Sequence, residues 1–197
     1  KGGERMEKVD PRIIRTRKLI MDAFVRLSKR MEYKDIKIKD ITTEATINRA
    51  TFYAHFIDKD DLLEKVLVED LMVHVLDEIK KHEIITAHTI RHLFFSLVEF
   101  RGTLQETCEK CYSSFEQKME LIMHRELISL FEGLLLNENN SLTKEHTRIK
   151  AVMLTGAITG AVKDYKRCCK LEKEEYINIV LNCLVNPIIK PANQSID

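Results

Sequence analysis

The sequence predicts an all-α protein in which a three-helix N-terminal unit precedes a larger C-terminal helical bundle, and three observations lead to this prediction. Only 6 of the 197 residues are Gly and 3 are Pro, so few turns are expected. Leu, Ile, Glu and Lys, which suit long helices, are abundant. Apolar residues recur at the three- and four-residue spacing of amphipathic helices, and no segment has the alternation expected of a strand.

The N-terminal unit begins with a helix expected over residues 12–31, after a flexible arm at 1–11. Its apolar face contains Ile20, Phe24 and Leu27 at helical spacing. A two-turn helix follows, because Ile38, Ile41 and Ala45 lie at i, i+3 and i+7. After a short break at 46–48, a third helix is expected over 49–55.

The caps of the next two helices are visible in the sequence. The side-chain oxygen of Asn48 can accept a hydrogen bond from a backbone N–H in the first turn of the 49–55 helix. Asp58 and Asp61 have the spacing of a capping box, and their carboxylates suit a helix N-terminus. One long helix is expected from about 59 to 81. It is apolar on more than one side, which predicts burial against several neighbours.

The rest of the chain predicts further helices with polar connections. They are expected near residues 86–100, 103–136 with one break, 144–168 and 172–186. Asn137–Asn140 reads as a polar loop, after which Ser141 or Thr143 can cap the next helix. The expected domains are therefore 12–60 and 61–186, followed by a frayed tail at 187–197.

Basic residues are concentrated in the N-terminal third. The formal charge is +4 over residues 12–65 and −3 over residues 66–197. Seven basic residues lie between Arg12 and Arg30, against a single acid, Asp22. A basic face on a small helical unit favours phosphate binding, although many such faces are only solvated.

Three short helices, the second and third tightly joined, are typical of a helix-turn-helix unit. The segment from Ile38 to Leu63 reads IKDITTEATINRATFYAHFIDKDDLL. It resembles the DNA-binding domain of the TetR family, whose pattern is Asp-Ile-Ala, a Gly-containing turn, Thr-(Phe/Leu)-Tyr-x-(His/Tyr)-Phe and Lys-x-x-Leu. The matching positions are Asp40, Ile41, Ala45, Ile47, Thr51, Phe52, Tyr53, His55, Phe56, Lys59 and Leu62, and Arg17, Ile20, Ala23 and Phe24 fit the family's first helix.

The resemblance implies a role for each matched position. Thr51, Tyr53, His55 and Lys59 would contact phosphates, which position the protein without reading bases. Asn48, Arg49 and Ala50 begin the recognition helix, where Arg49 can bind guanine through two hydrogen bonds and Ala50 can touch only a thymine methyl. Phe52 and Phe56 are assigned to the core. The expected DNA-binding set is Arg17, Asn48, Arg49, Ala50, Thr51, Tyr53, His55 and Lys59.

Three positions depart from the family pattern. Thr46 stands where the turn has Gly. A turn with positive φ would be strained by this β-branched residue, and a turn of different shape is the alternative. Ala50 stands where the family usually has Gly or a similarly small residue, which is a mild change. Lys37 replaces the Thr that caps the second helix and is a poor cap. These departures leave open an alternative: a TetR-type protein that has lost operator binding and acts as a protein-interaction partner or coactivator.

Small residues predict a close helix contact near the C-terminus. Gly156 and Gly160, like Ala157 and Ala161, lie four residues apart, which lets a neighbouring helix approach. The resemblance implies a four-helix dimer interface here, completed by the last helix; packing within one chain is the alternative. The expected interface residues are Gly156, Ala157, Gly160, Ala161, Tyr176, Ile179, Val180 and Cys183. A homodimer would place two recognition helices about 34–36 Å apart on a palindrome.

The resemblance also implies an effector pocket in the middle of the chain. Phe and Met side chains can line an apolar, adaptable cavity, although an ordinary core would look the same in sequence. The expected lining residues are Phe94, Phe95, Phe100, Tyr112, Phe115, Met119 and Met123. A ligand that favours a state with altered recognition-helix spacing would lower DNA affinity, so the expected function is a ligand-released repressor.

Other classes of function are not favoured. Cys108 and Cys111 form a C-x-x-C that could join the adjacent Cys168 and Cys169 in a thiol switch or metal site. His88 and His92 could bind a metal if a third ligand lay near. Because buried cysteines and surface histidines are common, no metal or cofactor is expected. The sequence shows no nucleophile–base pattern, phosphate loop or membrane-spanning run, so we expect a cytoplasmic protein that is not an enzyme.

Overall fold

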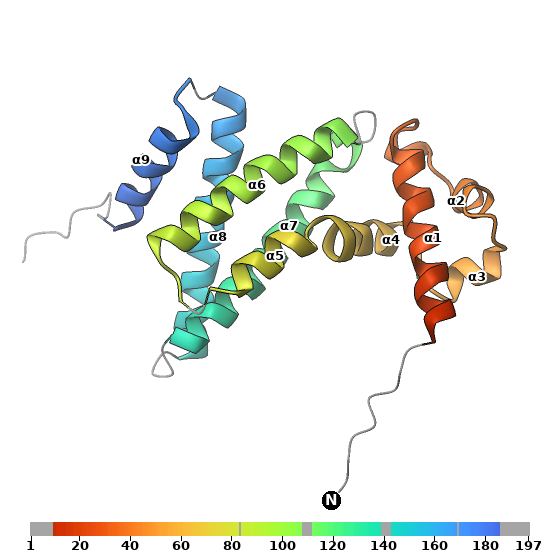
Figure 1. Cartoon of the computed structure of the whole chain (residues 1–197), viewed down its shortest axis with the longest axis horizontal. Helices are drawn as coiled ribbons and strands as arrows, with labels where there is room; N and C mark the ends of the chain where they lie inside the picture. Colours follow the sequence, from red (N-terminus) through yellow and green to blue (C-terminus); the bar gives the residue numbers. More distant parts are fainter. Residues whose placement is uncertain (1–9, 83, 108–111, 139–142, 169, 186–197) are drawn as a thin grey trace, which may run out of the picture. The chain divides into compact units, whose positions relative to one another are not determined.

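The computed structural model describes residues 10–82, 84–107, 112–138, 143–168 and 170–185. All regular structure in these ranges is helical, which confirms the all-α prediction (Figure 1). None of the helices in these ranges has the length and apolar character needed to cross a bilayer. The chain divides into two compact units, Lys1–Val73 with Gly102–Ile122, and His74–Arg101 with Met123–Asp197.

The first unit starts with α1 (Pro11–Ser28). The Asp10 carboxylate accepts a hydrogen bond from the Arg12 backbone N–H at 2.9 Å, and Pro11 occupies the first helical position, where its missing N–H costs nothing. The helix ends three residues earlier than predicted. It buries Ile20, Ala23 and Phe24 completely or almost completely, as its periodicity predicts.

A one-turn 3-10 helix, η1 (Tyr33–Asp35), leads to α2 (Ile38–Glu44), which packs on α1 (Figure 1). Lys37 stands at the N-cap of α2 and its side chain cannot accept a hydrogen bond. The carboxylate of Asp40, three residues on, accepts from the Lys37 backbone N–H at 2.9 Å instead. This bond satisfies the N–H of the N-cap residue itself, whereas a Thr side chain at position 37 would accept from an N–H in the first turn of α2.

Two further helices complete the N-terminal part of this unit: α3 (Arg49–Tyr53), which contacts α2, and α4 (Lys59–Lys65). The Asp58 carboxylate caps α4 by accepting from the Asp61 N–H at 2.8 Å, as predicted. The expectation of one regular helix over 59–81 is wrong. A π-helix, η2 (Val66–Leu71), follows α4, and α5 (Val73–Lys80) begins after Met72, whose N–H bonds to the Leu67 carbonyl at 2.7 Å.

The second unit contains most of α5 together with parts or all of four longer helices: α6 (Ala87–Thr107), α7 (Tyr112–Glu138), α8 (Lys144–Cys168) and α9 (Lys173–Val185). The break predicted near residue 102 is wrong, because α6 continues to Thr107. Thr143 is the cap of α8, with its hydroxyl accepting from the His146 N–H at 3.3 Å.

An aromatic cluster holds α6, α8 and α9 together. The Phe94 ring is fully buried, stacks on Tyr176 at 5.8 Å between centroids, and meets Tyr165 edge-on at 5.7 Å. Arg91 adds polar contacts from α6 to α9, with an ion pair to Glu174 and a 2.6 Å hydrogen bond to Asn178. Aromatic pairs of this kind stabilise by about 0.5–1.5 kcal/mol beyond area burial.

Candidate functional sites

The turn between α2 and α3 has the geometry of the helix-turn-helix motif despite its missing glycine. Thr46 has φ of 56°, and no other non-glycine residue in the described part of the chain has a positive φ. Its N–H bonds to the Thr43 carbonyl at 3.1 Å, and the Ile47 N–H bonds to the Thr42 carbonyl at 3.0 Å. This pair of bonds is a Schellman motif, in which the left-handed position is usually Gly. Thr46 therefore adopts the left-handed conformation that the turn requires, and its backbone is strained.

The recognition helix α3 is fixed at its start by Asn48. The Asn48 side-chain oxygen accepts from the Thr51 N–H at 2.8 Å and from the Thr51 hydroxyl at 3.0 Å, so the predicted N-cap is present. Phe52 and Phe56 on the inner side are 0% and 2% exposed, which agrees with their assignment to the core. Asn48, Arg49 and Ala50 are exposed together at the helix start.

Arg49 and Tyr53 form a pair on the outer face of α3. The Arg49 Nη2 lies 3.2 Å from the Tyr53 hydroxyl, and the guanidinium carbon lies 5.6 Å from the Tyr53 ring centre. Tyr53 is 47% exposed, whereas Phe52 beside it is buried. The outer face of α3 thus presents a cation, a phenol and an amide to solvent, all of which can bind nucleic acid.

Arg17 has several partners within the chain. Its Nη2 lies 2.9 Å from both carboxylate oxygens of Glu69, and its Nη1 donates to the His55 backbone carbonyl at 3.2 Å. The guanidinium also lies 4.7 Å from the Phe56 ring centre. These contacts join α1, η2 and the residues that follow α3. A phosphate contact by Arg17 stays a prediction and would compete with Glu69.

Lys59 also makes internal bonds, and it shows the importance of Tyr33, which the sequence analysis did not single out. The Lys59 Nζ donates to the carbonyls of Tyr33 at 2.7 Å and Ile36 at 2.8 Å, and lies 4.3 Å from the Tyr33 ring centre. The Tyr33 hydroxyl bonds to Asp60, which also accepts from Lys118 at 2.6 Å. Hydrogen bonds from Lys118 and then from Tyr33 hold the pKa of Asp60 below its ordinary value.

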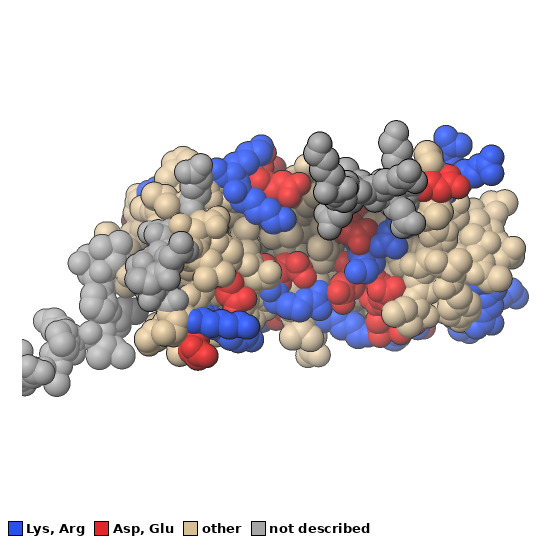
Figure 2. All heavy atoms as spheres, turned by 90° about the horizontal axis from the view of Figure 1, so that it is seen from below, with Lys and Arg blue, Asp and Glu red and all other residues tan. Residues whose placement is uncertain are grey.

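Several basic residues in α1 and just after it form ion pairs with acids. Lys18 lies 2.6 Å from Asp70, and Arg26 and Arg30 each lie 2.8 Å from a carboxylate oxygen of Glu44. Hydrogen bonds from Arg26 and then from Arg30 lower the pKa of Glu44. On the face seen in Figure 2, Lys and Arg side chains lie beside Asp and Glu side chains in several places. Asp70 lies outside residues 12–65 and so offsets part of the positive excess of that segment, whereas Glu44 is already counted in its balance.

The predicted dimer residues surround an apolar groove on α8 and α9. It has a volume of about 430 Å³ and includes Ala157, Ala161, Tyr176, Ile179, Val180 and Cys183 from the predicted set, with Leu171 and Leu184. Ile179 is 50% exposed. Gly156 and Gly160 are exposed, and a Cβ at either position would meet nothing within 4 Å. Tyr176 also stacks on Phe94 of its own chain, so its ring has an internal role as well.

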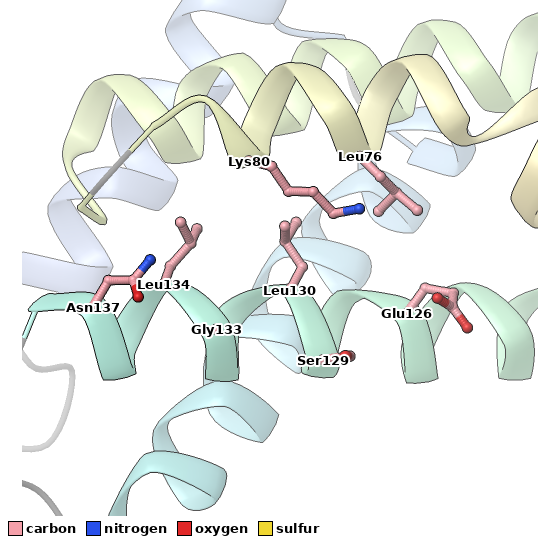
Figure 3. Close-up of a pocket in the computed structure, with 8 residues that line it drawn as sticks. All are labelled: Leu76, Lys80, Glu126, Ser129, Leu130, Gly133, Leu134 and Asn137. Atoms are coloured by element: carbon pink, nitrogen blue, oxygen red, sulfur yellow. The ribbon is translucent and has the colours of Figure 1, made fainter. Parts of the chain in front are cut away.

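Most of the residues predicted to line an effector pocket are buried where they are described, and their role as a pocket lining stays a prediction. Phe94 and Met119 are fully buried, and Phe100 and Met123 nearly so, while Phe95 is half-buried. The side chains of Tyr112 and Phe115 lie outside the described residues. A different groove, of about 410 Å³, lies between α5 and α7 (Figure 3). It is lined by Leu76, Lys80, Glu126, Ser129, Leu130, Gly133, Leu134 and Asn137.

Figure 3 shows the chemistry of this α5–α7 groove. Leu76 and Lys80 point from α5 toward the α7 helix, and Leu130 and Leu134 point from α7 toward α5. The Asn137 amide lies at one end and the Glu126 carboxylate at the other. The groove therefore has apolar walls with separate polar groups, which suits a ligand that has both an apolar and a polar part.

The cysteines give no further site in the described residues. Cys108, Cys111, Cys169 and the side chain of Cys168 lie outside them, and Cys183 is an exposed free thiol.

Comparison with known proteins adds to this geometry. Residues 20–66 match the family described as bacterial regulatory proteins, tetR family. A 65-residue stretch is 38% identical to the uncharacterized HTH-type transcriptional regulator YxbF of Bacillus subtilis; it covers 32% of this chain and only 17% of that relative.

Solved structures resemble most of the chain at low sequence identity. The putative TetR-family regulator of Syntrophomonas wolfei aligns with a TM-score of 0.61 at 18% identity, over 91% of this chain and 99% of that one. FadR of Bacillus subtilis, solved in complex with stearoyl-CoA, aligns with a TM-score of 0.53 at 19% identity, over 87% and 99%. The dihydroxyacetone kinase operon activator DhaS aligns with a TM-score of 0.55 at 18% identity, over 87% and 95%.

The turn, the capped recognition helix and its exposed outer face define a helix-turn-helix DNA-binding domain. The match over residues 20–66 identifies this domain as one of the TetR family, which confirms the resemblance seen in the sequence. The remaining helices have the fold of TetR-type regulators.

Proposed function

We propose that the chain is a homodimeric transcriptional regulator that binds a palindromic operator and is released from it by a small molecule, and so acts as a repressor. The observation that carries the proposal is the outer face of α3, where Asn48, Arg49, Ala50 and Tyr53 are exposed on a helix whose other side is anchored by Phe52. Such a helix can enter the major groove with its first residues against base edges.

Operator binding is tested by selecting bound fragments from a random DNA pool and measuring affinity by fluorescence anisotropy at several salt concentrations. We expect a palindromic site whose affinity falls steeply with salt. Arg49→Ala should lose about 1–3 kcal/mol and relax the preference at one base position, and Tyr53→Phe should weaken all sequences alike. Arg167→Ala, an exposed arginine near the end of α8, is the charge-matched control and should leave affinity unchanged.

Failure of this selection has a defined meaning. If no sequence is enriched and specific binding is no tighter than binding to bulk DNA, operator binding is refuted. The remaining candidate is then a TetR-type protein that acts through another protein. The two backbone hydrogen bonds of the Thr46 turn favour operator binding over this alternative, because they form even though Thr stands in place of the family's Gly.

Dimerisation through the α8–α9 groove follows from its apolar lining and from the open space beside Gly156 and Gly160. Introducing a charge with Ile179→Glu should shift the chain from dimer to monomer in analytical ultracentrifugation and reduce operator affinity. Leu121→Glu, at a position of α7 that is 72% exposed, serves as the control. A variant Ile179→Glu chain that stays dimeric would show that the interface lies elsewhere.

The α5–α7 groove is the proposed effector site. Since FadR of Bacillus subtilis was solved with stearoyl-CoA, acyl-CoA thioesters are the first compounds to test against the DNA complex. A Cβ at Gly133 meets nothing within 4 Å, so Gly133→Phe should fill the groove without disturbing α7. We expect this variant to bind DNA normally and to resist release, whereas Leu121→Phe should respond as the wild type does. If Gly133→Phe is released equally well, the effector binds elsewhere.

The sign of regulation is tested with a reporter gene placed behind the selected operator. Repression is expected without ligand and expression with it. DhaS, which has the same fold, is named an operon activator, so an increase of expression by the ligand-free protein is the outcome that would replace repression with activation.

A further inference from the structure

Three histidines gather where α5 ends and α6 begins in the second unit. His82 follows α5, and His88 and His92 lie one turn apart in the first half of α6. The ring centres are 5.5 Å apart for His82 and His88, 5.6 Å for His82 and His92, and 6.3 Å for His88 and His92. The sequence pattern shows the pair in α6, whereas only the folded chain brings His82 close to that pair.

The spacing of the ring nitrogens matches that of metal ligands. Nε2 of His82 lies 3.3 Å from Nδ1 of His92. Two nitrogens bound to one tetrahedral ion at about 2.0–2.1 Å are separated by about 3.3–3.4 Å. The same distance also allows a long hydrogen bond between the two rings. The arrangement of His82 and His92 therefore suits an ion between them as well as a direct hydrogen bond.

His88 is placed to be the third ligand. It precedes His92 by four residues, so both rings project from the same side of α6. In their present positions, no three His, Cys, Asp or Glu side chains among the described residues are arranged to hold an ion. His88 is exposed, and rotation of its ring toward the other two is a low-cost change of a terminal torsion.

The backbone around the three histidines is held in place. The His82 N–H donates to the Ile79 carbonyl at 3.0 Å, which fixes the residue to the last turn of α5. At the start of α6 the Thr86 hydroxyl accepts from the Thr89 N–H, and the Thr89 hydroxyl accepts from the Thr86 N–H, each at 3.2 Å. Since His82 and His92 are half-buried and His88 is exposed, the rings are supported by the protein and still open to an ion from solvent.

We propose that His82, His88 and His92 bind one divalent first-row transition-metal ion, with Zn²⁺ as the ordinary occupant. Three imidazoles suit zinc, copper, nickel and cobalt ions rather than Mg²⁺ or Ca²⁺, which prefer oxygen ligands. Water completes the fourth position. The ion links the end of α5 to the first half of α6, so its binding stabilises this part of the second unit.

The test is a titration of the untagged, EDTA-treated full chain with Co²⁺, followed by visible absorption, and then displacement of Co²⁺ by Zn²⁺. We expect a saturable ligand-field spectrum at one ion per chain. His88→Gln and His92→Gln should each weaken binding at least about tenfold. His146→Gln, which removes an exposed histidine from α8, is the matched control and should bind as the wild type does. Circular dichroism checks that helix content is unchanged.

Three outcomes would overturn the proposal. One is the absence of a saturable Co²⁺ signal. Another is an unchanged affinity in His88→Gln, which alters an exposed residue and so leaves the fold intact. The last is a strong near-ultraviolet thiolate charge-transfer band, which would place the ion on cysteines instead.

Discussion

Replacing Thr46 with Gly should stabilise the DNA-binding domain, which is unusual for a substitution to Gly. Thr46 has φ of 56°, and a left-handed conformation costs an L-residue about 1–2 kcal/mol. Glycine removes this cost but adds about 0.4–1 kcal/mol of conformational entropy to the unfolded chain. The expected net gain is about 0.5–1 kcal/mol, or about 1–4 °C in Tm for a chain of this length.

The matched control is Thr43→Gly, three residues earlier and inside α2. Thr43 is exposed like Thr46 but has ordinary helical geometry, so the same exchange should destabilise by a few tenths of a kcal/mol. Urea denaturation followed by circular dichroism measures both changes. Exchange of the Ile47 amide hydrogen, which bonds to the Thr42 carbonyl, should slow in Thr46→Gly and reports the turn alone. If both glycine variants lose stability, Thr46 is not strained in solution and the account of this turn is wrong.

Three more changes test contacts of the first unit. Asn48→Ala removes the α3 cap and should lower the free energy of unfolding by about 0.5–2 kcal/mol in urea denaturation. Asn48→Ser keeps a capping oxygen and should recover most of this loss. If the two variants lose the same stability, the cap is not the cause of the loss. Glu69→Gln releases Arg17, so stability should fall by no more than about 1 kcal/mol because the pair is partly exposed, and DNA affinity should rise if Arg17 reaches a phosphate. The Asp60 pKa is lowered in the folded state, so its stabilisation is present above the unfolded carboxyl pKa of about 4 and is lost as pH falls through the folded value. Asp60→Asn should therefore be less stable than wild type at pH 7, and the difference should shrink as pH falls below about 4 in thermal melting; a difference that does not change with pH would contradict the assigned cause.

Local features of the first unit could be predicted from the sequence because they depend on neighbouring residues. The Asn48 cap, the Asp58 cap and the burial of Phe52 and Phe56 each follow from spacings of four residues or fewer. These elements account for the helix-turn-helix assignment. The positive φ at Thr46 could not be settled in this way, because the left-handed residue after a helix is usually Gly and a β-branched residue disfavours it.

Contacts between distant residues could not be predicted in the same way. The partners of Arg17 and Lys59 lie in other helices and loops, so their internal bonds appear only in the folded chain. The π-helix at Val66–Leu71 escaped prediction because its segment is apolar on several sides, and the apolar pattern then does not fix the helical register. Sequence also does not distinguish a pocket lining from an ordinary core, so the role of large apolar residues such as Phe94, which is buried, stays a prediction.

The two exposed glycines of α8 make the sign of one substitution depend on protein concentration. Within a helix, Gly is less favourable than Ala by about 0.8–1.0 kcal/mol, and a Cβ at Gly156 or Gly160 meets nothing in its own chain. At high dilution, where subunits would be separate, alanine at these positions should make the chain harder to unfold. At high concentration the same methyl groups would keep a second helix at a distance and weaken association. Two melting curves of one variant, recorded a thousandfold apart in concentration, would then shift in opposite directions from those of the natural chain.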